Sequence, residues 1–317
     1  MAMMMALVVK NKETILKTKP TIYILAGPTA VGKTAVSIAL AKALNTEIIS
    51  ADSRQCFTEL SIGVARPSEA EIAAVQHYFI ADHSVEADIN AGYFEQFALY
   101  KSEAVFAKND QLVMVGGTGL YIRAFCEGID PMPQINPSIR EAIIANYTSK
   151  GLIWLQAELK HRDPVFWETA EKSNPQRLMR ALEVLNATGK SILHFRTAEK
   201  KQRTFNVVKI GLEMPMDLLT NRINARVDQM IQDGLLEEVQ SVLQYRNKPA
   251  LQTVGYKELF DYLDGNISKE EAILQIKQHT RQYAKRQMTW FKKDPEFRWI
   301  NMANDSVESA VAKILGE

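Results

Sequence analysis

The sequence predicts an α/β protein in which a parallel sheet carries helices and is interrupted by a mainly helical insertion. Three observations lead to this class. Short apolar runs alternate with stretches of helical periodicity, a glycine-rich turn joins the first run to the first helix, and one long stretch has helical patterns without a good strand. Strands that alternate with helices favour a parallel sheet covered on both faces. The chain has 317 residues, 46% of them hydrophobic, which is enough for one large domain or for a core with a smaller second domain.

Five short apolar runs are the expected strands. They lie at residues 22–26, 47–50, 78–81, 112–115 and 207–212. The first run ends at Gly27, and small and apolar residues then recur at helical spacing over residues 33–44. We therefore expect a strand, a glycine loop and a helix at the start of the sheet.

The stretch between the fourth and fifth runs has helical patterns only. We expect it to form a helical insertion over residues 126–204, between core segments at residues 20–125 and 205–317. Within the insertion, Asn174 and Pro175 predict a helix start, with Asn as the N-cap and Pro at the first helical position.

After the last expected strand the periodicity is helical. Helices are expected at residues 216–233, 235–244, 254–263 and 268–291. Ser268 followed by Glu271 fits a capping box, in which each side chain satisfies the other residue's unpaired backbone amide.

Composition excludes several classes of protein. The net charge is +1, so attraction to a polyanion must come from local clusters of charge. Cys56 and Cys126 are too far apart for a CxxC metal site or a disulfide framework, and two cysteines alone suit the reducing cytoplasm. Residues 1–9 are apolar but too short to span a bilayer, and no positive charge precedes them. We interpret them as a frayed leader and expect no membrane association.

One motif indicates specific chemistry. Residues 27–34, which we call the phosphate loop, match the pattern GxxxxGK[ST] between an expected strand and an expected helix. Its members are Gly27, Pro28, Thr29, Ala30, Val31, Gly32, Lys33 and Thr34. Glycines let backbone amides converge on phosphate oxygens, and the helix N-terminus adds about half a positive charge. Lys33 would neutralise the terminal phosphate and Thr34 would ligate Mg²⁺. The alternative is an ordinary glycine-rich turn before a helix.

Asp52 is the candidate acid beside the phosphate loop. It follows the expected strand at residues 47–50, and the carboxyl ends of parallel strands face the ligand crevice. We therefore expect Asp52 to point toward the group that Lys33 holds. Ser53 and Gln55 in the same loop could orient a polar heterocycle. The competing interpretations are a turn cap for Asp52 and solvated loop residues for the other two.

A second glycine turn, at residues 116–119, follows the expected strand at residues 112–115. A nucleotide hydrolase usually has a magnesium-holding Asp at the end of such a strand, so these glycines argue against an ATPase. Thr118 could donate a hydrogen bond to a ligand or act as the N-cap of the next helix. Arg222 and Arg226 lie four residues apart on an expected helix. They could close over a diphosphate or be solvated surface residues.

Positive charge is concentrated in the last expected helix and the turn after it. The basic residues are Lys277, Arg281, Lys285, Arg286, Lys292 and Lys293, interleaved with Tyr283, Trp290 and Phe291. Such a stripe suits nucleic acid, because phosphates gain a counter-charge and bases a stacking surface. The alternative is a solvated helix face whose aromatic side chains pack inward. Arg140, Gln176, Arg177 and Arg180 form a smaller polar and basic group in the insertion.

These separated blocks together resemble the tRNA dimethylallyltransferase family, whose members isopentenylate adenosine 37 of tRNA. The matching blocks are residues 27–34, 52–55, 62–63, 116–121, 174–183, 254–256 and 280–291. They occur in the family's order over nearly the whole chain, and together they are far more specific than the phosphate loop alone.

The resemblance implies a fold and a reaction. The fold would be a P-loop NTPase-like core with a mainly helical insertion, between which the anticodon arm is gripped and the target base flipped. The phosphate loop and Arg226 would bind the diphosphate of dimethylallyl diphosphate, with Mg²⁺ on Thr34. Asp52 would be the base for the adenine N6 amine, and Lys33 and Thr118 would be the other catalytic residues. The product would be N6-isopentenyladenosine in tRNAs that read codons beginning with U.

A tRNA-contacting surface is expected from the resemblance together with the basic helix. Its members are Asp52, Ser53, Arg54, Gln55, Thr118, Arg140, Gln176, Arg177, Leu178, Met179, Arg180, Arg281 and Lys285. The expected partners are the tRNA anticodon stem-loop and dimethylallyl diphosphate, and we expect a monomer.

Some positions depart from the family pattern. Cys56-Phe57 stands where the family usually has a Tyr, and Val64 and Arg66 replace the Thr and Lys of the usual IGTAKP. These changes affect hydrogen bonding around the loop. The phosphate loop, Asp52 and Thr118 are retained, so activity is expected.

Three rival functions fit parts of the pattern. A small-molecule kinase would also use a phosphate loop, a strand-end Asp and arginines. A non-catalytic RNA-binding module would explain the basic helix but not Asp52 beside Lys33. An adenylate isopentenyltransferase would share the chemistry with a free nucleotide as acceptor, whereas the long insertion and the basic helix favour tRNA.

Overall fold

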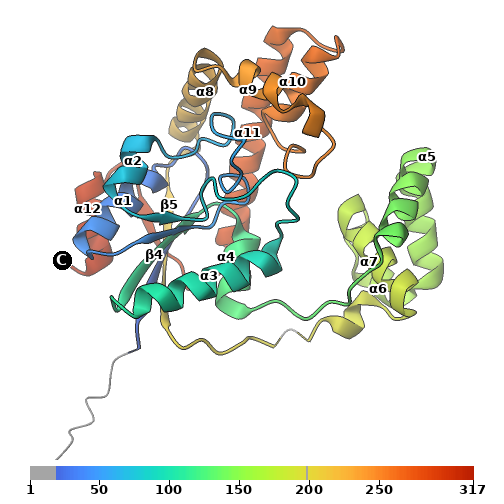
Figure 1. The fold of residues 1–317 in the computed structure, drawn as a ribbon, viewed down its shortest axis with the longest axis horizontal. Coiled ribbons are helices and arrows are strands. Elements are labelled where there is room, and N and C mark those ends of the chain that lie inside the picture. Colours follow the sequence, from blue (N-terminus) through green and yellow to red (C-terminus); the bar gives the residue numbers. More distant parts are fainter. Residues whose placement is uncertain (1–18, 198) are drawn as a thin grey trace, which may run out of the picture. The chain divides into compact units, whose positions relative to one another are not determined.

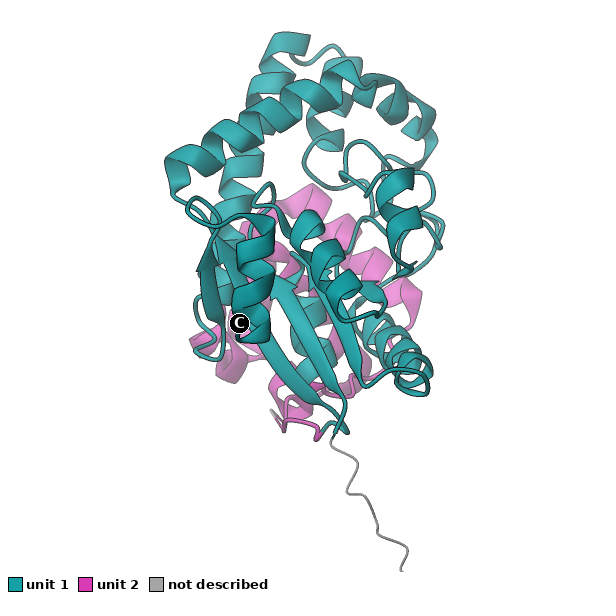
Figure 2. Ribbon diagram, turned by 90° about the vertical axis from the view of Figure 1, so that its left-hand side faces the viewer, with its two compact units in different colours: residues 1–126, 203–317 teal, residues 127–202 magenta. Residues whose placement is uncertain are grey.

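The computed structural model describes residues 19–197 and 199–317, so the leader expected at residues 1–9 lies outside the described part (Figure 1). The described chain forms two compact units (Figure 2). The sheet unit contains the residues up to Cys126 and from Arg203 to Glu317, and the helical unit is Glu127–Gln202.

The sheet unit is built on six parallel strands in the order β3-β2-β4-β1-β5-β6. Their bounds are Thr21–Ala26 (β1), Ile48–Ser50 (β2), His77–Tyr78 (β3), Gln111–Gly116 (β4), Asn206–Glu213 (β5) and Arg298–Asn301 (β6). The parallel α/β sheet expected from the sequence is confirmed. β1 and β4 are central and contain fully buried apolar side chains, as strands covered on both faces require. In their register Ala26 lies opposite Gly116, so the loops that follow both strands start side by side.

Nine helices belong to this unit in the described residues. They are α1 (Lys33–Ala43), α2 (Glu69–Ala74), α3 (Ala91–Phe106), α4 (Gly119–Glu127), α8 (Met216–Gln232), α9 (Leu235–Ser241), α10 (Tyr256–Leu263), α11 (Lys269–Phe291) and α12 (Val307–Leu315), with a 3₁₀ turn at Leu243–Tyr245. Helices α1 and α12 cover one face of the sheet, and α3 and α4 cover the other (Figure 1). Only the last residue of α4 crosses into the helical unit.

The strand expected at residues 78–81 is wrong in extent. β3 comprises only His77–Tyr78, because Phe79 has φ 64° and Ala81 has φ 49°, and left-handed residues cannot continue an extended strand. Strand β6 was also missed, since only helices were expected after β5. β6 is an edge strand that pairs with β5 alone, and of its four residues only Ile300 is buried, so no apolar run marks it.

The start of α11 forms half of the expected capping box. The Ser268 hydroxyl accepts a hydrogen bond from the Glu271 amide at 3.1 Å, as predicted. The Glu271 carboxylate, however, accepts from Gln275 Nε2 at 3.0 Å instead of turning back to the amide of Ser268. A complete capping box occurs at Ser68 and Glu71, at the start of α2.

The helical unit contains α5 (Pro137–Arg162), α6 (Pro164–Thr169), α7 (Pro175–Thr188) and a 3₁₀ turn (Ile192–Phe195), and its described residues form no strand. Its core is apolar and comes from all four elements. α5 breaks at Gly151, whose backbone is non-helical. Asn174 caps α7 by accepting from the Arg177 amide at 3.2 Å with Pro175 in the first turn, so the predicted helix start is confirmed.

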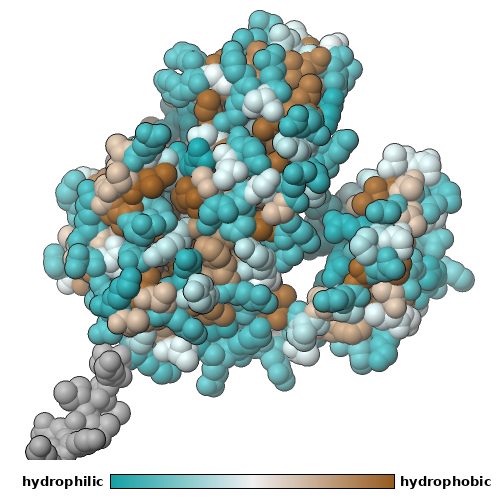
Figure 3. All heavy atoms as spheres, viewed as in Figure 1, coloured by the Kyte–Doolittle hydropathy of each residue, from teal (hydrophilic) through white to brown (hydrophobic). Residues whose placement is uncertain are grey.

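Hydrophilic side chains cover most of the face drawn in Figure 3, with groups of apolar residues among them. Within the described part of the chain, no helix combines the length and the apolar character needed to cross a bilayer.

Candidate active site

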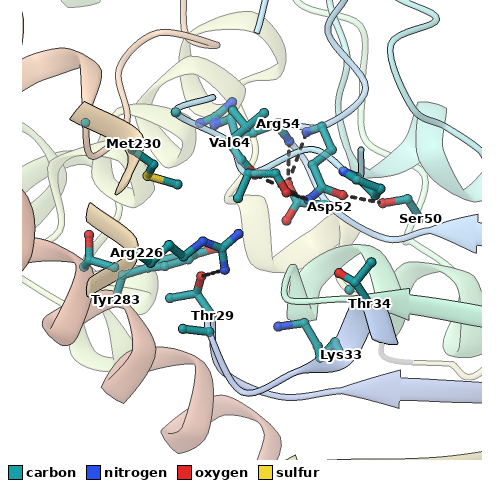
Figure 4. Close-up of a pocket in the computed structure, with 18 of the residues that line it drawn as sticks. Thr29, Lys33, Thr34, Ser50, Asp52, Arg54, Val64, Arg226, Met230 and Tyr283 are labelled. Atoms are coloured by element: carbon teal, nitrogen blue, oxygen red, sulfur yellow. Dashed lines mark hydrogen bonds between the residues drawn. The ribbon is translucent and has the colours of Figure 1, made fainter. Parts of the chain in front are cut away.

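A cavity of about 610 Å³ lies at the carboxyl end of the sheet (Figure 4). All of its lining residues belong to the sheet unit. Most of them come from the phosphate loop and α1, the ends of β2 and β4 with the loop after β2, the segment 63–67, helices α8 and α11, and the turn before α10. Segments that are far apart in the sequence therefore meet at one site.

The phosphate loop connects β1 to α1, as the motif predicted. Gly27 is required there because a Cβ atom at this residue would lie 2.5 Å from the Leu212 carbonyl oxygen. Gly32 has φ 107° and Ala30 has φ 65°, so the apex of the loop uses left-handed backbone. The helix behind the loop begins at Lys33, which directs its unpaired amides and the positive end of its dipole to the loop.

Lys33 is a cation held in an unfavourable place for a free charge. Its Nζ donates to the carbonyl oxygens of Pro28 at 2.7 Å and Gly27 at 3.0 Å. Burial and, to a smaller extent, the charge of Arg226 lower the pKa of Lys33 from 10.5 to about 7, although the charge of Asp52 opposes the shift. An anion bound at the loop would compensate this charge.

Arg226 approaches the phosphate loop from α8. Its Nη1 donates to the Thr29 hydroxyl at 3.4 Å, and burial lowers the pKa of its guanidinium. Arg222 on the same helix also lines the cavity. Figure 4 shows Arg226, Lys33 and Asp52 directed at the same space.

One carboxylate oxygen of Asp52 is hydrogen-bonded within its own turn, and the other is not. Oδ1 accepts from the amides of Arg54 at 2.8 Å and Gln55 at 3.3 Å, which is the turn-cap role considered as the alternative. Oδ2 makes no hydrogen bond to the described residues, and Asp52 lines the cavity. The turn thus fixes the carboxylate while one oxygen stays available to a ligand.

Gln55 lines the cavity, and its side-chain amide is hydrogen-bonded to neighbouring segments of the protein. Its Nε2 donates to the carbonyl oxygens of Ala65 at 2.9 Å and Val64 at 3.3 Å, and its Oε1 accepts from Ser50 Oγ at 3.2 Å. Gln55 therefore ties the end of β2 to the segment that carries Val64. Arg66 stands where the family usually has Lys, and its Nη1 donates a long hydrogen bond to the Thr58 carbonyl oxygen at 3.4 Å.

Cys56 and Phe57, the remaining departures, are both buried. Burial raises the pKa of the Cys56 thiol to about 12. A buried thiol with a raised pKa is unreactive, so Cys56 contributes only to packing. This departure from the family pattern therefore changes the packing beside the Asp52 loop and not the chemistry of that loop.

Thr118 acts through a neighbour instead of facing the cavity. Its Oγ1 accepts from the Ser53 amide at 3.0 Å and donates to the Ser53 hydroxyl at 3.3 Å. Thr118 is not among the cavity-lining residues, whereas Ser53 is. Gly116 allows this approach, since a Cβ atom there would lie 2.2 Å from the Ala51 carbonyl oxygen.

Two buried contacts were not found from the sequence. Gln287 on α11 bridges the two glycine loops, because its Oε1 accepts from the Thr29 amide at 2.9 Å and its Nε2 donates to the Gly117 carbonyl at 3.0 Å. The available signal was helical spacing, since Ile276, Thr280, Tyr283 and Gln287 all line the cavity.

Glu238 on α9 is the second missed residue. Its carboxylate accepts from the amides of Ser61, Ile62 and Gly63 at 2.8, 2.7 and 2.9 Å, and from the Tyr256 hydroxyl at 2.7 Å. It thereby holds the segment that leads into the cavity wall at residues 63–67. The sequence carried no local signal for this contact beyond the block 254–256.

The basic stripe of α11 is partly neutralised. Lys277 pairs with Asp228 at 2.6 Å, and Lys292, just after the helix, pairs with Glu213 at 2.7 Å. Phe291 is buried and packs inward, whereas Tyr283 and Trp290 are partly exposed, so the alternative interpretation holds for one of the three aromatic side chains. Arg281 donates to Asn224 Oδ1 at 2.8 Å, and Lys285 is exposed.

The remaining expected tRNA contacts lie in the helical unit. Arg180 and Arg140 both approach the buried Glu183 carboxylate, at 3.0 and 3.7 Å. Arg177 pairs with Glu171 at 2.8 Å. Leu178 is fully buried in the core of the unit and Met179 packs against that core, so these two side chains support α7. Gln176 is exposed at the start of the same helix.

No group of three or more His, Cys, Asp or Glu residues suited to a metal ion occurs within residues 19–197 and 199–317. The cavity does offer an oxygen ligand of the kind Mg²⁺ prefers, the Thr34 hydroxyl. Mg²⁺ is usually held by one or two protein oxygens together with substrate phosphates and water. The residues present therefore fit a Mg²⁺ ion that arrives with a diphosphate.

Comparison with known proteins identifies the family. The sequence profile described as IPP transferase matches residues 55–294. A tRNA dimethylallyltransferase of Cytophaga hutchinsonii is 45% identical over 88% of this chain and 92% of the relative, and one of Christiangramia forsetii is 46% identical over 88% and 93%. The tRNA isopentenylpyrophosphate transferase of Bacillus halodurans has a TM-score of 0.69 at 34% identity, covering 94% of this chain and 96% of that structure.

A eukaryotic dimethylallyltransferase solved while acting on tRNA also shares the fold, with a TM-score of 0.75 at 22% identity over 92% of this chain and 78% of that one. The sheet unit therefore has the P-loop NTPase-like fold expected from the sequence. This chain belongs to the IPP transferase family.

Proposed function

We propose that this protein transfers the dimethylallyl group of dimethylallyl diphosphate to N6 of adenosine 37 in tRNAs that read codons beginning with U. The products are N6-isopentenyladenosine and diphosphate. The observation that carries the proposal is the cavity in which the phosphate loop and the free oxygen of Asp52 face the same space. The names of the relatives support the same reaction.

The diphosphate binds at the phosphate loop. The amides at the start of α1, Lys33 and Arg226 supply fixed positive charge where negative charge grows as the carbon–oxygen bond breaks. Burial and the charge of Arg226 lower the pKa of Lys33 when no anion is bound, so an arriving diphosphate favours the protonated form of Lys33. Thr34 and the diphosphate oxygens would hold Mg²⁺, which supplies further charge neutralisation on the leaving group.

Asp52 acts as the general base. The adenine N6 lone pair is delocalised into the ring, so the amine becomes a better nucleophile when its proton is removed during attack. One N6–H proton passes to Asp52 Oδ2, the N6–C bond forms, and the C–O electron pair leaves with the diphosphate. A positioned base contributes about 10²- to 10⁴-fold. Thr118 keeps this base in place through Ser53, and it acts as a positioning residue.

The tRNA anticodon stem-loop binds to both units in this proposal. Arg140, Gln176, Arg177 and Arg180 of the helical unit, and Arg281 and Lys285 of α11, meet its backbone, and residues 52–55 meet the target nucleotide. Adenosine 37 must leave its stack, at a cost of a few kcal/mol that phosphate contacts offset. The enzyme is a monomer and works in the cytoplasm, where its tRNA substrate is found.

A direct assay tests the function. The protein is incubated with dimethylallyl diphosphate, Mg²⁺ and unmodified tRNA, and nuclease digestion with mass spectrometry locates the added group. We expect one isopentenyl group on the base 3′ of the anticodon, and none when that adenosine is replaced by guanosine. Transfer of label from γ-labelled ATP to a small acceptor, without isopentenylation, would instead establish the kinase.

A further inference from the structure

Gln287 joins the two loops that form the cavity. It lies on α11, is 6% exposed, and contacts the Thr29 amide at 2.9 Å and the Gly117 carbonyl at 3.0 Å. Thr29 belongs to the phosphate loop, and Gly117 belongs to the turn after β4. These two loops follow adjacent strands, but Gln287 reaches them from more than 160 residues away in the sequence.

The glycine turn is shaped to receive this helix. A Cβ atom at Gly117 would lie 2.1 Å from Gln287 Nε2, and one at Gly119 would lie 2.1 Å from Trp290 Nε1. Gln287 and Trp290 are three residues apart, so they are neighbours on one face of α11. A side chain at Gly119 would therefore collide with the Trp290 ring, and one at Gly117 would displace the Gln287 amide from its hydrogen bonds.

On the first side, Gln287 holds the apex of the phosphate loop. Thr29 is gripped twice, at its amide by Gln287 and at its hydroxyl by Arg226. The next residue, Ala30, has φ 65°, which is unfavourable for alanine and persists only when the surroundings fix it. Without Gln287 the Thr29 amide loses its partner and the apex loses one of its two restraints.

On the second side, Gln287 holds the loop that carries Thr118. Gly117 is followed by Thr118, whose hydroxyl binds the amide and hydroxyl of Ser53, the residue after Asp52. Hydrogen bonds thus link the phosphate loop through Gln287 to Gly117, and link Thr118, the residue after Gly117, to Ser53, the residue after Asp52.

We propose that Gln287 is a positioning residue that sets the distance between the phosphate loop and the carboxylate of Asp52. The inference deepens the proposed function and rests on it for its kinetic part. A displacement of the reacting groups by about 1 Å lowers the rate roughly 10²-fold. A residue that joins the diphosphate site to the base can therefore have a large effect on kcat.

Two variants of similar size separate positioning from folding. Gln287→Met removes both hydrogen bonds while keeping the volume of the side chain. Gln287→Glu can replace the amide only when its carboxyl is protonated, because the neutral acid has one donor and one acceptor, whereas the ionised form has acceptors only. Gln275→Met is the matched control, since Gln275 is on α11, donates a hydrogen bond to Glu271 and does not line the cavity.

For Gln287→Met we expect kcat to fall at least tenfold and the Kd for inorganic pyrophosphate to rise, with faster hydrogen exchange at the Thr29 amide. For Gln287→Glu we expect the ratio of its kcat to that of wild type to recover as pH falls. A purely structural role would lower thermal stability in both variants without this pH dependence. The control should match wild type in all readouts.

The outcomes that overturn the inference are distinct from failure of the function. Wild-type kcat and pyrophosphate affinity in folded Gln287→Met, or a pH-independent ratio for Gln287→Glu, would show that Gln287 only stabilises the fold. If wild type itself transfers no prenyl group to tRNA, the proposed function fails. In that case the affinity for pyrophosphate and hydrogen exchange at the Thr29 amide still decide whether Gln287 holds the phosphate loop in place.

Discussion

At the scale of single residues, Asp52 is fixed by its own turn. Replacement by Asn keeps an acceptor for the Arg54 and Gln55 amides but cannot take a proton from N6. We expect Asp52→Asn to bind tRNA near normally and to lose at least 10²-fold in transfer rate. Single-turnover kinetics with filter binding measure both quantities. Turnover close to wild type would remove Asp52 as the base.

Lys33 gives the site a predictable pH dependence. Its pKa is about 7 in the free protein, so at pH 8 it is mostly neutral. A bound diphosphate favours the charged form, and binding at pH 8 therefore takes up protons on Lys33. Affinity for pyrophosphate should accordingly weaken as pH rises above about 7.

Calorimetry in two buffers of different ionisation enthalpy measures this uptake. Lys33→Met is the reference, because it keeps the side chain's length and retains the protons that pyrophosphate itself exchanges. We expect proton uptake to be larger for wild type, and the variant to bind pyrophosphate at least tenfold more weakly. Equal uptake by both proteins would contradict the assignment of Lys33.

The sequence predicts local residues of this site well and distant ones poorly. The phosphate loop follows from eight consecutive residues, and Asp52 follows from its place after a strand. Thr118 was expected to touch the ligand, but its hydroxyl binds Ser53, 65 residues away in the chain. Gln287 and Glu238 act only through contacts that exist once the chain is folded, so no local spacing reveals both partners.

At the scale of elements, α9 holds the segment 61–63 through Glu238. This carboxylate accepts three backbone amides and a tyrosine hydroxyl, and an amide group cannot accept at both of its atoms. We expect Glu238→Gln to lower the free energy of unfolding by about 1–3 kcal/mol. Urea denaturation measures it, with exposed Glu237→Gln as the control. Equal free energies of unfolding for the two variants would show that contacts other than Glu238 hold residues 61–63 in place.

The helix α11 makes a separate prediction about RNA. If Arg281 and Lys285 contact tRNA phosphates, replacing both by Gln should reduce the slope of log affinity against log salt by about one to two units. Lys42 and Lys108 are exposed near the amino end of the strands, and the same double substitution there should leave the slope unchanged. An unchanged slope for the α11 variant would mean that its cations are only solvated or paired.

The elements also show which patterns in the sequence are informative. β1 and β4 are central and buried on both faces, so continuous apolar runs revealed them. β6 lies at the edge and lacks such a run, and β3 ends where Phe79 turns to positive φ, so neither could be placed correctly from apolar runs. The Asn174-Pro175 start was predictable because N-cap chemistry is local.

At the scale of the whole molecule, the two units have separate cores and separate tasks in the proposed reaction. The sheet unit contains every residue that lines the cavity, and the helical unit contributes charged residues anchored on α5 and α7. The composition of the chain reveals little of this, since a net charge of +1 conceals the local basic groups.

A crystal structure of the protein with Mg²⁺, an unreactive thio analogue of dimethylallyl diphosphate and an anticodon stem-loop would test most directly whether the phosphate loop and Asp52 serve one reaction. We expect the analogue's diphosphate on Lys33 and the phosphate loop, with Asp52 Oδ2 within about 3 Å of adenine N6. An Asp52 carboxylate turned away from the adenine, or a diphosphate bound outside the loop, would contradict this expectation.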